Sequence, residues 1–175
     1  MRLAIHLLLF ILVVFSTLVS AQERGGAGAN EAPYEFGFHV GNFLPNQIDG
    51  VTEIMGLGGA RGGFRLSPGT YLETGIIAGN GEGVQWKNLH VDVRMNIPVE
   101  DLLAVAYVGA DSVMYKGANG GEKLIFGGHV GGGVEAHLSG LVWFRADMKF
   151  GASPGTSLYI GCGLVFRLGA SGSGS

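Results

Sequence analysis

Ionisable side chains stand at alternate positions in several short segments of this chain, between apolar neighbours. Buried charges are tolerated only when they are paired and hydrogen-bonded, so such side chains on one shared inner face predict a network of ion pairs. A narrow ion path, gated by exchange of partners between arginines and carboxylates, is the alternative. The acidic and basic members nearly balance, and they are Glu35, Arg61, Arg65, Glu73, Asp92, Arg94, Asp111, Glu135, Arg145, Asp147, Lys149 and Arg167.

Four histidines fall in the same register as these charges, and with Glu135 they suggest a metal site, because histidine is a common metal ligand. They are His39, His90, His129 and His137. These positions are spread over three segments, and neither H-x-x-x-H nor HExxH spacing occurs. We therefore expect hydrogen-bonded interior histidines, with no metal and no cofactor.

The glycine runs over 56–59 and 127–128 contain neither G-x-G-x-x-G nor a G-K-[ST] ending, and neither run opens a helix. They are therefore poor candidates for phosphate binding. Glycine at this density is expected to relieve crowding and to let strands bend around a tight barrel.

The elements that position these side chains have a period of two, which is that of a β-strand. In the clearest segment, 89–97, apolar residues at the odd positions alternate with His90, Asp92, Arg94 and Asn96. Similar segments are expected over 34–44, 53–66, 70–78, 102–115, 122–138, 142–150 and 157–168, with no long helical pattern between them. Eight such strands predict an all-β chain.

The first 21 residues have the pattern of a cleaved secretory signal peptide. Arg2 precedes an apolar run over 3–15, and small residues lead to a cleavage site after Ala21. The apolar run is shorter than the ~20 residues that a membrane-spanning helix needs. We expect a flexible lead-in over 22–33, a single domain over 34–168 and a Gly/Ser-rich tail over 169–175. Cys162 is the one cysteine, which excludes an internal disulfide.

The composition is unusual for a protein surrounded by water. Only 14% of the residues are charged, 33 are glycine, and the mean hydropathy is +0.34, whereas about 25% of an average protein is charged. The net charge of −3 disfavours nucleic-acid binding. A surface with so little charge is better suited to lipid, which favours charged side chains inside a closed barrel and apolar side chains outside it.

Across 34–168 the chain resembles the small eight-stranded outer-membrane β-barrels of the OmpA/OmpX-like superfamily. The resemblance is carried by the order and spacing of four motifs, Ala106–Asp111, Gly131–Ser139, Val142–Asp147 and Gly163–Leu168. In the last motif, Gly163, Phe166 and Leu168 are similar to the strand signal that such barrels present to the barrel assembly machinery. The chain departs from the pattern because no aromatic residue ends the final strand and because its loops are short.

The resemblance implies an eight-stranded antiparallel up-and-down transmembrane β-barrel in the outer membrane. Its N-terminus and the turns near 67–68, 98–101 and 139–140 would face the periplasm, and the other four connections would lie outside. Outer-membrane lipids, the assembly machinery and a further protein are the expected partners. A structural or docking role is favoured. The alternatives are a narrow pore and a soluble periplasmic lipocalin-like barrel with an apolar lumen.

Two further expectations concern particular side chains. Some barrels of this kind are lipid A acyltransferases or deacylases, but His137 and Ser139 have no matching acid motif, so we expect no enzyme. Trp86, Trp143 and Tyr34 are candidates for aromatic girdles at the membrane boundaries or for loop or lumen aromatics. The register of Trp143 favours the lumen.

Overall fold

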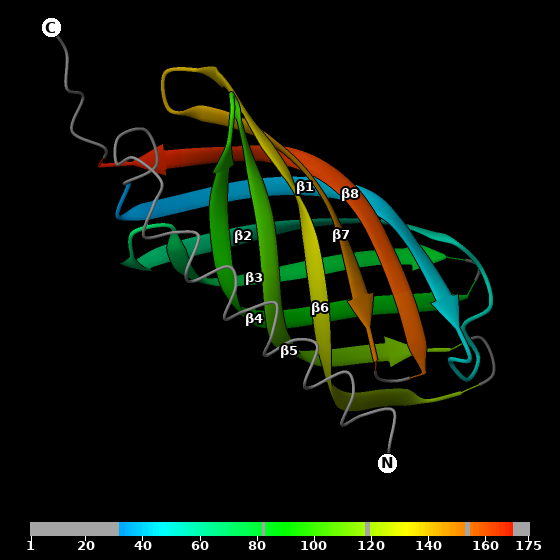
Figure 1. Ribbon diagram of the computed structural model, residues 1–175. Helices are drawn as coiled ribbons and strands as arrows, with labels where there is room; N and C mark the ends of the chain where they lie inside the picture. Colours follow the sequence, from blue (N-terminus) through cyan, green and yellow to red (C-terminus); the bar gives the residue numbers. More distant parts are fainter. Residues whose placement is uncertain (1–31, 82, 118–119, 153–154, 170–175) are drawn as a thin grey trace, which may run out of the picture.

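The computed structural model of the chain describes residues 32–81, 83–117, 120–152 and 155–169. Eight antiparallel strands follow one another around a closed barrel (Figure 1). They are β1 (Tyr34–Asn46), β2 (Met55–Ser67), β3 (Thr70–Gly81), β4 (Val84–Val99), β5 (Leu102–Lys116), β6 (Glu122–Ser139), β7 (Val142–Gly151) and β8 (Thr156–Leu168). No helix in these ranges is long and apolar enough to cross a membrane. The predicted signal peptide, most of the lead-in and most of the tail lie outside the described residues.

The barrel closes because β1 pairs with β2 on one side and with β8 on the other. The β1–β8 ladder runs from Tyr34 opposite Leu168 to Asn46 opposite Thr156. Closure gives every one of these strands two hydrogen-bonded neighbours, so none of them forms an unpaired edge. The predicted all-β, eight-stranded antiparallel architecture is confirmed.

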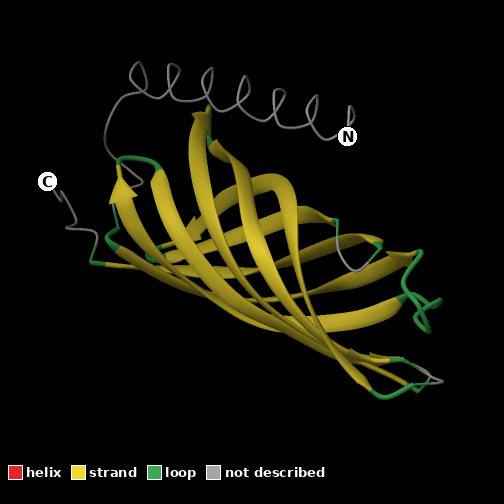
Figure 2. Cartoon of the chain, turned by 90° about the horizontal axis from the view of Figure 1, so that it is seen from below, coloured by secondary structure: helices red, strands yellow, loops and turns green. Residues whose placement is uncertain are grey.

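The connections gather at the two ends of the barrel, as Figure 2 shows. The terminal end holds the start of β1, the end of β8 and three two-residue turns centred on Pro68, Glu100 and Gly140. The loop end holds the other connections, which cover residues 47–54, 82–83, 117–121 and 152–155. Gly69, Glu100 and Gly140 have φ values of 70°, 53° and 51°, in the left-handed region that tight turns use.

Strand β4 begins at Val84, five residues before its predicted start. In this first part the polarity of the two faces is reversed, since Val84 and Trp86 are buried in the lumen while Gln85 and Lys87 are exposed. The predicted strand rests on an alternation with apolar residues outside and polar residues inside. This alternation is lost before residue 89, so the sequence pattern does not include the first part of β4.

Along the middle of the barrel, apolar side chains face outward and charged ones face inward. Val91 and Phe144 are 47% and 37% exposed, whereas Arg94 and Asp147 are 0% and 7% exposed. The predicted orientation of the two faces is therefore confirmed. Met95, in the same register as Val91, is an exception and is buried.

The lumen is filled in three layers. An apolar cluster that we call the aromatic plug closes the loop end, where Trp86 has ring centroids 4.4 Å from Phe43 and 5.6 Å from Tyr115. Charged side chains occupy the middle, and Leu103, Trp143 and Val165 pack together near the terminal end. The aromatic plug consists of Phe43, Ile48, Val51, Met55, Leu57, Ile77, Val84, Trp86, Val113, Tyr115 and Tyr159.

Both tryptophans therefore lie in the lumen, Trp86 in the aromatic plug and Trp143 at the terminal end. The girdle alternative is wrong for both, and the lumen position expected for Trp143 is confirmed. Tyr34 is exposed on the outer face, where its ring centroid lies 5.7 Å from that of Phe64.

Inward-facing glycines make room for the central layer. A Cβ added to Gly59 on β2 would collide with the backbone oxygen of Ile76 and would lie 2.8 Å from Nε2 of His39. The adjacent Gly58 faces outward, and the nearest atom to its added Cβ is the backbone oxygen of His39 at 3.8 Å. The expected role of glycine in relieving crowding applies to the first of these positions and not to the second.

Substitution of these neighbours separates the two environments. We expect Gly59→Ala to lower the free energy of unfolding by about 1–3 kcal/mol, because the extra methyl overpacks the lumen. Gly58→Ala should change it by less than about 0.5 kcal/mol. Urea unfolding of the barrel in detergent micelles measures both, and equal midpoints for the two variants would contradict this account.

Candidate functional site

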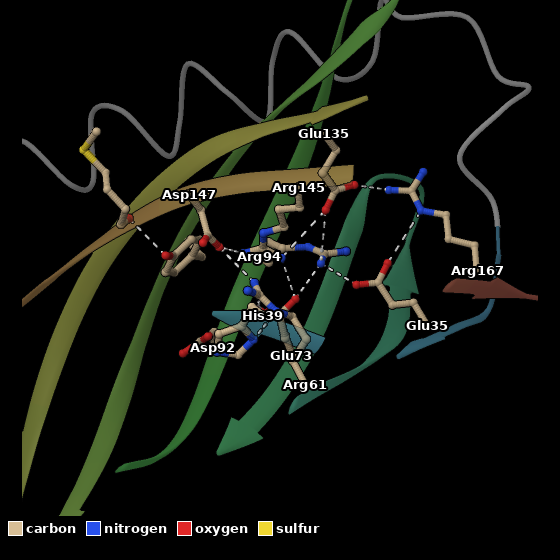
Figure 3. Close-up of polar contacts among 12 residues, drawn as sticks. Glu35, His39, Arg61, Glu73, Asp92, Arg94, Glu135, Arg145, Asp147 and Arg167 are labelled. Carbon is tan, nitrogen blue, oxygen red and sulfur yellow. Dashed lines mark hydrogen bonds and ion pairs between the residues drawn. The ribbon is translucent and has the colours of Figure 1, made fainter. Parts of the chain in front are cut away.

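All eight strands send at least one charged side chain into the lumen. An eight-stranded barrel is just wide enough for its inward side chains, so groups at the same height meet across it (Figure 3). Of the twelve residues predicted to share the lumen, eleven are buried and Arg65 is half-buried. The eleven form two groups, which we call the arginine cluster and the histidine cluster.

The arginine cluster is built around Arg94 of β4, which is fully buried. Its Nη1 contacts a carboxylate oxygen of Glu35, lies 2.5 Å from Oε2 of Glu73 and lies 3.7 Å from Oε1 of Glu135. The guanidinium also stands over the ring of Tyr71, 4.6 Å from its centroid. Charge and π-face together compensate the loss of water around this cation.

Glu73 of β3 is shared by three arginines. Arg94 and Arg145 reach its Oε2 at 2.5 Å and 2.8 Å, and Arg61 reaches its Oε1 at 3.6 Å. Asp147 joins the same group, since it lies 2.9 Å from Arg61 and 2.7 Å from Arg145. One carboxylate thus links cations from β2, β4 and β7.

Arg167 of β8 extends the arginine cluster toward the terminal end. It pairs with Glu135 and lies 3.7 Å from Glu35, and its guanidinium stands 4.1 Å from the ring centroid of Trp143. Arg145 has a similar aromatic neighbour, Tyr107, at 5.3 Å. The prediction named these charges but not their aromatic partners, although Tyr71 and Tyr107 stand in the same inward register.

The histidine cluster lies closer to the loop end and centres on His129 of β6. Its two ring nitrogens lie 2.6 Å from Asp92 and 2.7 Å from Asp111. Both partners are carboxylate oxygens, which accept hydrogen bonds, so the ring donates from both nitrogens. Such a ring is an imidazolium, with a positive charge. Lys149 pairs with Asp111 at 2.9 Å and lies 3.2 Å from Nδ1 of His90.

With His129 charged, the buried part of the described chain is electrically balanced. Six carboxylates (Glu35, Glu73, Asp92, Asp111, Glu135 and Asp147) face five buried arginine and lysine side chains (Arg61, Arg94, Arg145, Lys149 and Arg167), and the imidazolium is the sixth cation. Each of these groups lies within ion-pair distance of an opposite charge.

The four histidines that share the inward register do not share one environment. His39 accepts a hydrogen bond from Arg61 at 3.2 Å, and His90 and His129 lie in the histidine cluster. The expectation that His137 is an interior residue is wrong, because it is exposed at the rim beside the β6–β7 turn. It bonds the carbonyl oxygen of Gly140 at 3.0 Å. Among the described residues, no group of three or more histidine, cysteine or acidic side chains could hold a metal ion.

Side chains fill most of the lumen. Two internal cavities have volumes of about 20 Å³ and 10 Å³, and each has room for about one water molecule. The larger lies under the aromatic plug and is bordered by Asn88, Lys149 and Tyr159 among others. The charged middle layer contradicts the alternative of a lipocalin-like barrel with an apolar lumen.

The three residues predicted to form an assembly signal lie on β8 near the β1 seam. Phe166 and Leu168 share the outward register, and Phe166 stacks on Phe36 with a centroid distance of 4.8 Å. Gly163 faces inward, and a Cβ there would collide with the backbone of β1 at Phe38.

Solved structures match this fold, whereas no protein-family model and no curated sequence matches the chain. The N-terminal β-barrel domain of Pseudomonas aeruginosa OprF has a TM-score of 0.64 and 12% identity, covering 78% of this chain and 98% of that chain. Neisserial surface protein A has a TM-score of 0.68 and 8% identity with the same coverage. A structure from the de novo design of transmembrane β-barrels has a TM-score of 0.50 and 15% identity, covering 81% of this chain and 100% of that chain. The resemblance to small OmpA/OmpX-like barrels is confirmed at the level of the fold.

Neutralising the central arginine tests the energetic role of the arginine cluster. We expect Arg94→Met to lower the free energy of unfolding by about 3–5 kcal/mol, because Glu35 and Glu73 keep their burial and lose a cation. Lys87→Gln, on the outer face of the same strand, should be nearly neutral.

Adding Glu35→Gln to Arg94→Met removes one of the two deprived carboxylates and should restore part of the loss. Urea unfolding in micelles measures all three variants. An Arg94→Met midpoint equal to that of Lys87→Gln would refute the stabilising role of the arginine cluster.

Proposed function

We propose that this chain is an integral outer-membrane β-barrel protein with a structural or partner-docking role, a closed lumen and no catalytic activity. The observation that carries the proposal is the distribution of side chains over the barrel wall. Buried charges are paired inside, and large apolar side chains cover the outside.

The outer face fits lipid better than water. Within the described strands, the charged side chains in the outward register are Lys87, Lys116 and Glu122, all near the loop end. The rest of this face exposes aromatic and aliphatic residues such as Phe38, Val91 and Phe126. A contiguous apolar surface of this extent is unfavourable in water and favourable in a bilayer.

Strand length and closure support the same proposal. Each strand has between 10 and 18 residues, and a tilted strand needs about 9–11 to cross a bilayer. A closed sheet also satisfies the backbone groups that hydrocarbon cannot bond. Export through the signal peptide and presentation of Phe166 and Leu168 to the assembly machinery belong to this proposal, with the loop end outside the cell.

The filled lumen favours a structural role over conduction. The two water-sized cavities among the lumen side chains offer no room for a hydrated ion. The short connections at the loop end leave the barrel wall and its rims as the surface available to a partner.

A charge placed on the outer face distinguishes lipid from water. We expect Val91→Arg, in the middle of the apolar face, to reduce folding into lipid vesicles by about 2–4 kcal/mol. Gln85→Arg, on the same face of β4 near the loop end, should cost about 0–1 kcal/mol. The measurement is the fraction of folded, faster-migrating protein on unheated gels.

Two results would contradict the proposal of a membrane-embedded barrel. One is a protein that stays in the soluble fraction of cells without detergent. The other is a Val91→Arg variant that folds in aqueous buffer as well as the unmodified chain.

The closed lumen has its own test. In planar lipid bilayers the folded protein should produce no discrete conductance steps, because the arginine cluster blocks the axis. Reproducible single-channel steps from the purified barrel would favour the narrow-pore alternative.

A further inference from the structure

The β1–β2 connection, residues 47–54, folds back over the loop-end mouth of the lumen. Ile48 and Val51 point into the aromatic plug and are 4% and 2% exposed. A hydrogen bond from the backbone N–H of Val51 to the oxygen of Ile48 (3.1 Å) holds them together. They are the two members of the aromatic plug that do not come from a strand.

The strand residues below these two side chains form a cup. Phe43, Trp86 and Tyr115 line its aromatic wall, with centroid distances of 4.4 Å and 5.6 Å along the row. The cavity of about 20 Å³ lies beneath, and Asn88, Ser157 and Tyr159 contribute polar atoms to its lining. Ile48 and Val51 pack against these residues from the loop end.

The ion pair that ties the segment to the barrel is weak. In the described part of the chain, its side-chain ion pair is Asp49 with Lys123 of β6 at 2.6 Å, and these side chains are 84% and 45% exposed. The hydrogen bond from Lys123 lowers the pKa of the Asp49 carboxyl, so the pair is charged at neutral pH. Water and salt screen such an exposed pair, which therefore contributes little to holding the segment.

The backbone of the segment has one residue in an unfavourable conformation and meets its neighbours at two glycines. Gln47, its first residue, has a φ of 58°, in the left-handed region that non-glycine residues adopt at a cost. The segment passes its neighbouring connections at glycines, since Gly117 faces Gly50 and Gly155 faces the oxygen of Gln47. No side chains interlock at these two contacts.

We propose that residues 47–54 form a lid that opens and closes on the folded barrel, with Gln47 as its hinge, Ile48 and Val51 as its seat and the Asp49–Lys123 pair as its latch. The open lid gives molecules at the loop end access to the aromatic cup while the arginine cluster below stays shut. The lid does not depend on the proposed membrane location, because it concerns only the loop-end mouth of the barrel.

Trp86 reports on the cup directly. The chain has two tryptophans, so a Trp143→Phe background leaves Trp86 as the one fluorophore of its kind. The full barrel, folded in detergent micelles, is titrated with acrylamide, a small neutral quencher. The quenching constant then measures how often the lid is open.

We expect Lys123→Gln to raise the quenching constant about two- to fivefold. The effect is modest because an exposed ion pair contributes only a small part of the free energy that keeps the lid closed. The double variant Ile48→Ser with Val51→Ser should raise the quenching constant by more than about tenfold, because both buried apolar seats are lost. Lys87→Gln, an exposed lysine on the outer face of β4, is the matched control and should leave the quenching constant unchanged. Exchange of the latch charges, Asp49→Lys with Lys123→Asp, should restore the low value.

Gel migration of the unheated protein establishes that each variant is folded. An unchanged quenching constant in folded Lys123→Gln and in the folded seat variant would overturn the lid. A rise seen only together with loss of the folded gel band would overturn it as well, because opening would then require the barrel to unfold. If the seat variant does not fold, Lys123→Gln and the charge exchange still decide the question.

Discussion

The pairing of charges inside a closed wall is the constraint on which the rest of this molecule depends. A carboxylate or guanidinium removed from water must find opposite charge and hydrogen bonds nearby. The described lumen meets this demand with groups that share partners, as Glu73 does among Arg61, Arg94 and Arg145. The inward glycines follow from the same demand, because Gly59 and Gly75 leave the space that His39 and His90 occupy.

The lumen is filled by apolar side chains at its two ends and by charged side chains between them. Aromatic and aliphatic side chains seal the loop end, where Trp86 packs between Phe43 and Tyr115, and a smaller apolar group packs around Trp143 at the other end. Between them, the charged groups sit away from both mouths. This placement raises the strength of each ion pair, because little water reaches it, and it also raises the cost of losing a partner.

The strands, their turns and the orientation of their faces could be predicted from the sequence because a period of two persists through most of each strand. The prediction stopped at residue 89 on β4 because inward and outward polarity change places at Val84 and Trp86. His137 was misplaced because register gives the face of a strand but not the height along it, and His137 lies beside the β6–β7 turn, where its side chain is exposed. The pairs themselves could not be predicted. Arg61 on β2 meets Asp147 on β7 across the lumen, and such partners depend on the tilt and stagger of the closed barrel.

The seam between β1 and β8 joins the two ends of the strand order, and Glu35 and Arg167, which are paired across it, both enter the arginine cluster. A strand that slips by two residues keeps its apolar side chains outside and its polar side chains inside, so this alternation alone does not fix the register. The ion pairs do fix the register, because such a slip would move Arg167 about 7 Å along the axis of β8 and away from Glu135. The charged interior therefore favours the observed register of the seam between the first strand and the last, in which Arg167 lies beside both Glu35 and Glu135.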